Sequence, residues 1–174
     1  MRVTLIEYPN DRDWMEVKRR ALITVGLNPV SSPSLEWKRK ILDARHSPIR
    51  YLRFSFLIED LPSWVAVHLA RHVHAQPYVR SQRNDRQDMY DRNTAPQNTP
   101  VSMIYDVNGE EIMTIANKRL CKLASPETQE VVQKMCDAVI EVCPEYDFLL
   151  VPMCVQQRAC HEMNSCGWYY DQGL

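Results

Sequence analysis

The 174-residue sequence has little glycine, almost no net charge and no long apolar run. With only four glycines and 45% hydrophobic residues, extensive disorder is not expected. The formal net charge of −1 argues against bulk electrostatic binding to nucleic acid or acidic membranes. No apolar run approaches the ~18 residues that a spanning helix needs, and residues 1–7 indicate a first strand rather than a signal peptide. These absences predict one cytoplasmic domain, residues 1–174, with neither a membrane nor a nucleic-acid partner.

Cysteine is absent from the first 120 residues and concentrated in the last third. The six cysteines are Cys121, Cys136, Cys143, Cys154, Cys160 and Cys166. A disulfide framework would staple the whole chain, whereas a local cluster in a cytoplasmic protein is more often a metal site.

Four of these thiols are candidate ligands of a structural zinc. They are Cys121, Cys154, Cys160 and Cys166. An iron–sulfur cluster suits four cysteines equally, and Cys143 and His161 are competing ligands. The alternative, a reduced cysteine buried as a small hydrophobe, fits Cys136 and also Cys143. The pattern predicts a metal-stapled tail over about residues 143–174.

Hydrophobic periodicity predicts a single domain that contains both strands and helices. Strands are predicted at residues 2–8 and 51–58, and helices at 14–22, 35–44, 60–74, 110–123 and from 125 onward. From Tyr51 to Ile58, apolar residues occupy every second position, which is typical of a half-buried strand. Ser34 and Asp60 are expected to cap helices, with Pro62 in the first turn of the helix that Asp60 starts.

Residues 71–83 combine cations with hydroxyl and amide donors. Arg71 and His72 end an apolar helix, and Ser81, Gln82 and Arg83 follow in a loop, a combination that suits an anionic ligand such as phosphate. The polar segment 80–100 is either a solvated loop or a functional one, since loops of this length are unusual in compact domains.

His68, Arg71 and His72 are spaced to share one helix face. Histidines four residues apart can also bind a metal, but the helix has no acidic third ligand and Arg71 would repel a cation. A purely structural role for His68 is an equal alternative.

Arg119 falls inside the apolar stripe of the helix predicted at 110–123. A guanidinium there must extend to solvent, pair with an acid or face a ligand.

Several segments resemble the flavin-dependent thymidylate synthase family over about residues 2–167, with gaps. Arg71, His72, Ser81 and Arg83 fit its motif of Arg-His-Arg, seven residues, Ser, and an arginine two further on. The run from His46 through Ser47, Pro48, Ile49 and Arg50 to Tyr51 resembles its His-x-Ser-Pro-Leu-Glu-His segment. Residues 108–119 resemble its Asn-Ala-Arg-Ser-Leu helix, which ends in Leu-Arg.

This resemblance implies an α/β (α+β) fold with a small mixed or antiparallel sheet flanked by helices. It also implies reductive C5 methylation of dUMP to dTMP, with FAD as cofactor and NADPH and methylenetetrahydrofolate as co-substrates. It assigns the nucleotide to Ser81, Gln82, Arg83, Arg119 and His68. It assigns the flavin side to Arg71, His72 and Asn108. Tyr51 is a further cofactor-binding candidate, whose ring can stack on the folate. No catalytic nucleophile or base is expected, because the family's chemistry runs through the flavin. A homotetramer with shared active sites is implied, and residues 81–86 resemble short, phage-encoded members, which act in the host cytoplasm.

Several positions depart from the family pattern. Val73 replaces the second arginine of the triplet, Glu110 replaces the arginine two after Asn108, and Tyr51 replaces the second histidine of the early segment. Fewer cations near a pyrophosphate predict either weaker flavin binding or a changed binding mode in which Arg80, Arg86 or Arg92 substitutes. The rival hypotheses are a related C5 pyrimidine-modifying enzyme, such as a hydroxymethylating one, and a zinc-stapled nucleotide-binding protein without catalysis.

Overall fold

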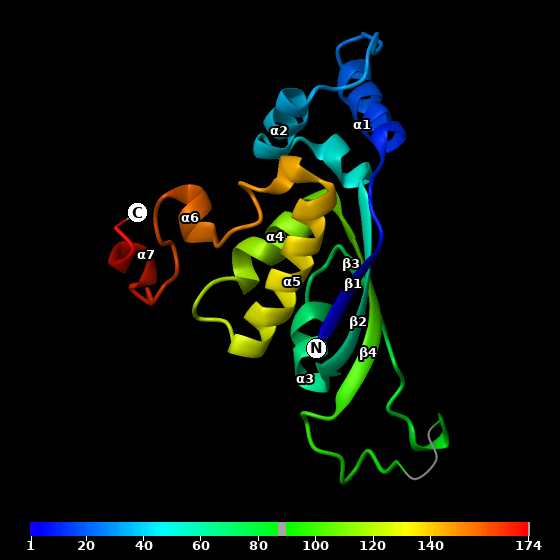
Figure 1. Cartoon of the computed structure of the whole chain (residues 1–174), viewed down its shortest axis with the longest axis vertical. Coiled ribbons are helices and arrows are strands. Elements are labelled where there is room, and N and C mark those ends of the chain that lie inside the picture. Colours follow the sequence, from blue (N-terminus) through cyan, green and yellow to red (C-terminus); the bar gives the residue numbers. More distant parts are fainter. Residues whose placement is uncertain (87–89, 174) are drawn as a thin grey trace.

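The computed structural model describes residues 1–86 and 90–173 as a four-stranded antiparallel sheet with helices against one face (Figure 1). The strands are β1 Arg2–Glu7, β2 Arg53–Pro62, β3 Ala75–Val79 and β4 Pro100–Asn108, in the order β1-β2-β4-β3. The sheet is purely antiparallel, so the α+β prediction is confirmed and the mixed alternative is not needed.

The longer helices are α1 Asp11–Ile23, α2 Leu35–Asp43, α3 Ser63–Ala70, α4 Gly109–Arg119 and α5 Pro126–Val142. Shorter ones are η1 Ser47–Tyr51, η2 Asn84–Arg86, η3 Pro144–Tyr146, α6 Met153–Gln157 and α7 Trp168–Asp171. Helices α3, α4 and α5 lie beside the sheet, and α1 and α2 lie beyond one end of it (Figure 1). Among the residues described, no helix combines the length and apolar character that crossing a membrane requires.

One face of β2 forms the centre of the core. Phe54, Phe56 and Ile58 alternate along the strand and are fully buried, as the sequence predicts. Opposite them in the register lie Val107, Tyr105 and Met103 of β4, which are buried on the same face. The other face carries more exposed groups, among them Ile104 and Tyr78 of neighbouring strands.

Several helix boundaries follow from capping. Ser34 accepts a hydrogen bond from the Trp37 amide and starts α2, and Ser125 accepts one from the Thr128 amide and starts α5. Asn108 ends β4 and caps α4 by accepting from the amides of Glu110 and Glu111.

The prediction that a helix starts at Asp60 is wrong. The register of β2 shifts between Ile58 and Leu61, and Asp60 has a φ of 55°, so a bulge lets the strand continue. Pairing resumes at Leu61 with Val101, and α3 begins only at Ser63. The predicted end at His74 is also wrong, because α3 stops at Ala70 and Ala75 begins β3. Proline at position 77 is tolerated because β3 is an edge strand.

The segment 80–100 is mostly loop, as predicted, with η2 inside it; residues 87–89, Asp88 among them, lie outside the described residues.

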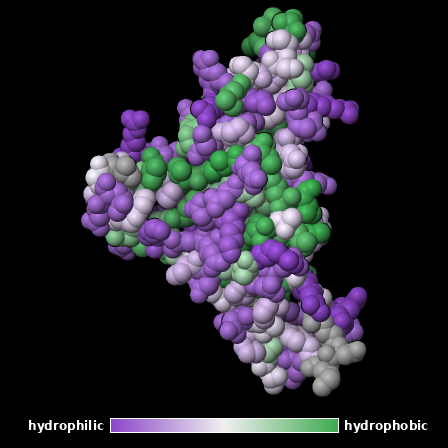
Figure 2. All heavy atoms as spheres, in the orientation of Figure 1, coloured by the Kyte–Doolittle hydropathy of each residue, from purple (hydrophilic) through white to green (hydrophobic). Residues whose placement is uncertain are grey.

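The loop after α1 carries exposed apolar side chains. Val25, Leu27 and Val30 lie in it, and its surface is apolar at the top of Figure 2.

Candidate functional site

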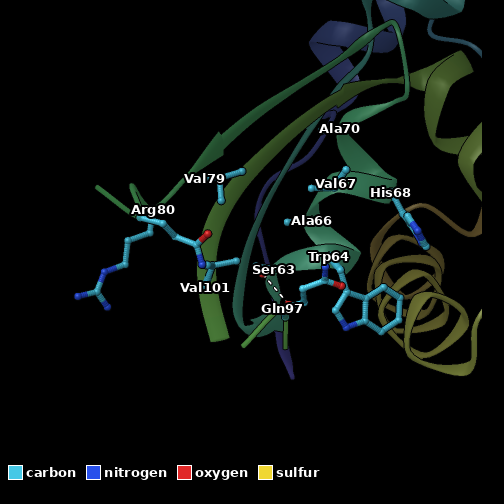
Figure 3. A pocket seen from close by; sticks show the side chains of 11 residues that line it. Ser63, Trp64, Ala66, Val67, His68, Ala70, Val79, Arg80, Gln97 and Val101 are labelled. Atoms are coloured by element: carbon cyan, nitrogen blue, oxygen red, sulfur yellow. Dashed lines mark hydrogen bonds between the residues drawn. The ribbon is translucent and has the colours of Figure 1, made fainter. Parts of the chain in front are cut away.

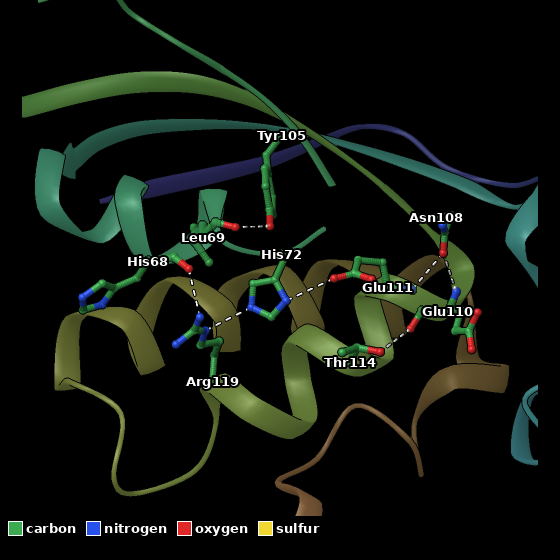
Figure 4. Close-up of polar contacts among 9 residues, drawn as sticks. All are labelled: His68, Leu69, His72, Tyr105, Asn108, Glu110, Glu111, Thr114 and Arg119. Atoms are coloured by element: carbon green, nitrogen blue, oxygen red, sulfur yellow. Dashed lines mark hydrogen bonds and ion pairs between the residues drawn. The ribbon is translucent and has the colours of Figure 1, made fainter. Parts of the chain in front are cut away.

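Arg119 is held at the C-terminal end of α4 by two contacts to the α3 region (Figure 4). Its Nε donates to Nε2 of His72 at 3.0 Å, and its Nη2 donates to the backbone carbonyl of His68 at 3.0 Å. On the other side of the ring, Nδ1 of His72 lies 3.1 Å from Oε1 of Glu111. Three residues from two helix regions thus form one continuous chain of polar contacts in a mostly buried place.

The charge of Arg119 lies in an unusual environment. Burial, followed by the nearby Arg71 guanidinium, lowers the pKa of the Arg119 guanidinium. Within the described residues, both recorded contacts of Arg119 go to neutral acceptors rather than to a carboxylate. Two neighbouring cations to which the described residues offer no direct acidic partner form a place that an anionic or carbonyl-rich ligand would stabilise.

Because α3 ends at Ala70, the residues His68, Arg71 and His72 do not share one helix face as the sequence predicted. Arg71 is the C-cap and is exposed, whereas His72 follows the helix and turns inward. His68 contacts Thr128 through Nδ1 at 3.3 Å instead. The described residues contain no group of three or more metal-binding side chains, so the alternative of a metal at His68 and His72 gains no support.

The candidate flavin residues Arg71, His72 and Asn108 belong to one end of the sheet. Arg53, the first residue of β2, pairs with Asn108 at the end of β4, and Ala75 pairs with the adjacent Val107. The residues just before Ala75 therefore reach the same end as Asn108. Val73, where the family pattern has arginine, is 85% exposed there.

The acidic replacement at position 110 has a local partner. Glu110 forms an ion pair with Arg50 of η1. Tyr51, the neighbouring residue, is 39% exposed, and the Arg20 guanidinium lies 4.0 Å from its ring centre. Tyr51 follows Arg50 at the end of η1, with only Leu52 between it and β2, so it belongs to the same end of the sheet as Asn108.

An open pocket of about 550 Å³ lies between α3 and the ends of β3 and β4 (Figure 3). Trp64 and His68 line it together, and their rings meet edge-on with centroids 5.3 Å apart. Gln82 also lines it, so the pocket brings together two of the predicted nucleotide residues, and His68 links it to Arg119. The Arg80 side chain extends away from the two aromatic rings.

Ser81 and Arg83, two further predicted nucleotide residues, lie in the loop after β3. The Arg83 amide donates to Ser81 Oγ at 3.3 Å, and the Arg83 guanidinium pairs with both oxygens of Asp85 at 2.8 and 2.6 Å. Arg80 lies five residues after Ala75, which corresponds to about 16 Å along an extended chain. Within one chain, the Ser81 loop and the Asn108 end of the sheet are therefore not brought together.

The four candidate zinc ligands line one small cavity of about 20 Å³. His161 and Glu162 line it too. No three metal-binding side chains of the described tail are nevertheless close enough to share an ion, so this geometry does not support the predicted zinc site. Burial, followed by the neighbouring Cys121 and Cys160, raises the pKa of the Cys154 thiol. Cys136 and Cys143 are buried as predicted, and burial raises the pKa of each to about 12.

Sequence reasoning missed three residues of the site. Glu111 is buried against His72, the Tyr105 hydroxyl donates to the Leu69 carbonyl at 2.9 Å, and Trp64 lines the pocket. Burial, followed by the Glu111 carboxylate, raises the pKa of Tyr105. A signal for Glu111 was present, because it lies next to Ile112 on the buried face of α4 and eight residues before Arg119.

Comparison with known proteins identifies relatives of this chain. Residues 86–145 match the sequence model of a family described as thymidylate synthase complementing protein. A search of curated proteins found no matching sequence.

Solved structures share the fold. Thymidylate synthase X from Helicobacter pylori, solved with FAD and dUMP, has a TM-score of 0.68 at 16% identity, covering 86% of this chain and 99% of its own. The UMP/dUMP methylase PolB from Streptomyces cacaoi, bound to 5-Br dUMP, has a TM-score of 0.69 at 15% identity, with 86% and 96% covered. At these identities the likeness establishes the fold, including the antiparallel sheet with its flanking helices.

Proposed function

We propose that the chain is a flavin-dependent thymidylate synthase, because residues 86–145 match the thymidylate synthase complementing protein family and the chain shares the fold of thymidylate synthase X. The reaction is reductive methylation of dUMP at C5, with methylenetetrahydrofolate as carbon donor and NADPH as reductant. The observation that carries the proposal is Arg119, a partly buried cation whose contacts in the described structure are neutral and which lies beside Arg71.

The nucleotide site is proposed around α3. Arg119 donates to the pyrimidine, and its fixed guanidinium orients the ring through directional hydrogen bonds. Gln82 and His68 line the adjoining pocket, where the Trp64 ring offers a stacking surface. Ser81 and Arg83 act from the loop after β3, and Arg83 exchanges Asp85 for the phosphate when the nucleotide binds.

The flavin site is proposed at the Asn108 end of the sheet. The donor set there fits an anionic dinucleotide, because Arg53 and Arg71 are exposed cations and Glu110 is already paired with Arg50. Arg71, His72, Asn108 and Tyr51 are the residues that would hold FAD. When bound, the flavin supplies redox chemistry that passes hydride from the nicotinamide to the transferred carbon. The protein residues bind, orient and exclude water from the reacting groups.

A homotetramer with shared active sites belongs to the same proposal. The distance between the Ser81 loop and the Asn108 end of the sheet favours a site completed by a second copy, in which one chain's loop meets another chain's flavin surface. The exposed apolar side chains Val25, Leu27 and Val30, and Tyr78 on the outer sheet face, are candidates for burial in such an assembly.

A structural zinc in the tail is a separate, finer part of the proposal. Its support is the single small cavity lined by Cys121, Cys154, Cys160 and Cys166. In the described structure these thiols are not close enough to share an ion, so the tail must close around the ion for four thiolates to bind.

A second candidate is a related pyrimidine-nucleotide methylase with a different substrate or product. The shared fold with a UMP/dUMP methylase favours it, as does the exchanged Arg50–Glu110 pair at the proposed flavin surface. A hydroxymethylated product belongs to this alternative. A nucleotide-binding protein without catalysis is the third outcome to be tested.

Titration of the purified protein with FAD and dUMP tests the proposal directly. We expect an oxidised-flavin visible spectrum and saturable dUMP binding by calorimetry. Arg119→Ala should weaken dUMP binding by on the order of 2–4 kcal/mol, because a charged hydrogen-bond partner is lost. Lys118→Ala, which changes an exposed neighbour, is the matched control. Unchanged dUMP affinity in Arg119→Ala would remove the nucleotide assignment.

A further inference from the structure

Glu111 lies behind the contacts that hold Arg119, and the family comparison does not account for it. Glu111 is only 5% exposed and His72 only 9% exposed, so both residues are almost completely removed from water. The chain of contacts runs from Glu111 through His72 to Arg119 (Figure 4). It crosses from the first turn of α4 to its last residue by way of the segment that follows α3.

The position of the ring proton follows from these contacts. A guanidinium is a donor only, so Nε2 of His72 must accept the hydrogen bond from Arg119 Nε. The neutral ring then carries its single proton on Nδ1, which donates to Glu111 Oε1. Glu111 thereby holds the tautomer that presents an acceptor to Arg119.

The burial of Glu111 is not explained by the packing of α4. A buried carboxylate loses its hydration, and a leucine at position 111 would pack beside Ile112 without that loss. Two further groups lie close to these contacts. One is the Tyr105 hydroxyl, whose pKa depends on burial and on the charges of Glu111 and Arg119, and the other is the Arg71 cation beside Arg119. None of these replaces Glu111 as the acceptor of the ring proton.

We infer that Glu111 is a positioning residue for nucleotide binding, acting through His72 on Arg119. Resting on the proposed function, this inference deepens it by naming the residue that fixes its central cation. His72 and the His68 carbonyl anchor two donors of the guanidinium, so the remaining donors keep one orientation before the ligand arrives. Preorganisation of this kind raises affinity without adding a contact to the ligand.

Two substitutions at position 111 separate positioning from structure. Glu111→Gln keeps an oxygen that accepts the Nδ1 proton, whereas Glu111→Leu fills the space without an acceptor. We expect Glu111→Leu to weaken dUMP binding by about 10-fold, as for other residues that orient a histidine from behind, with Glu111→Gln restoring most of the affinity. In an Arg119→Ala background, Glu111→Leu should cause no further loss, because its effect passes through Arg119.

The histidine ring gives a readout that does not depend on dUMP. Nitrogen-15 spectra of the unliganded wild-type protein should report a neutral His72 with its proton on Nδ1, and Glu111→Leu should change that signature. A wild-type His72 protonated on Nε2 would overturn the inference even if the leucine variant does not fold. Unchanged dUMP affinity in Glu111→Leu, or an equal loss with and without Arg119, would overturn it while leaving the nucleotide site intact. Unchanged affinity in Arg119→Ala would instead overturn the nucleotide site itself.

Discussion

Arg50 and Glu110 form an ion pair between η1 and the first turn of α4. In the family segments that these stretches resemble, glutamate stands at the position of Arg50 and arginine at that of Glu110. The two charges are exchanged rather than lost, so the carboxylate of Glu110 is compensated locally. The remaining departures from the family pattern at this end of the sheet are Tyr51 in place of a histidine and the missing cation at position 73.

Restoring that cation should tighten flavin binding. Val73 is 85% exposed, so Val73→Arg introduces a guanidinium without disturbing the core. A charge-assisted contact to a phosphate is worth about 1.5–3 kcal/mol, so we expect FAD affinity to rise by about 10-fold or more. Fluorescence titration with FAD measures the change, and Val73→Gln, which adds length without charge, is the control. Equal FAD affinities in all three proteins would show that the flavin lies elsewhere.

Gly109 should be intolerant of any side chain. A Cβ at this position would lie 2.6 Å from both the Ile49 carbonyl oxygen and the Tyr146 hydroxyl, and both of these residues are fully buried. We expect Gly109→Ala to destabilise the fold by roughly 1–3 kcal/mol through overpacking, measured by urea unfolding.

Tyr146→Phe provides a matched partner for that substitution. The buried Tyr146 hydroxyl has no hydrogen-bond partner in the described structure, so its removal alone should cost little. Combined with Gly109→Ala, it should recover part of the lost stability because one of the two close contacts disappears. Strictly additive effects would contradict this account of the packing at the start of α4.

The tail prediction concerns metal content. If Cys121, Cys154, Cys160 and Cys166 close around an ion, protein purified without added metal should contain zinc near one per chain by elemental analysis. Cys160→Ser should lower that content, and Cys136→Ala, which changes a thiol buried elsewhere in the core, should not. An absence of zinc, with these four thiols titrating freely in the folded protein, would mean that the cavity holds no metal.

The predictable part of the fold is the part specified locally. The side chains of Ser34 and Ser125 cap the helices that follow them, so the helix starts are visible in the sequence. The alternation of Phe54, Phe56 and Ile58 likewise specifies which face of β2 is buried. Strand β3 escaped prediction because it is a short edge strand containing Pro77, and β4 because it follows a long polar loop. Both depend on pairing with distant partners, which no local pattern encodes.

The candidate site divides in the same way. Arg119 was detectable because a cation inside an apolar stripe violates the pattern of its own helix. The bulge at Asp60 and the early end of α3 were not detectable, and they decide that His72 turns inward while Arg71 stays exposed. Glu111 contacts His72 only because His72 turns inward after α3, so the sequence alone does not show its role.

Turnover with all four small molecules tests the central claim most directly. The protein is incubated with FAD, NADPH, methylenetetrahydrofolate and dUMP, and the nucleotide pool is resolved by chromatography and mass spectrometry, with Arg119→Ala in parallel. The account predicts dTMP in the wild-type reaction, dependent on each component and strongly reduced in the variant. A hydroxymethylated product would favour the related C5-modifying enzyme, and no modified nucleotide at saturating FAD would contradict the synthase assignment.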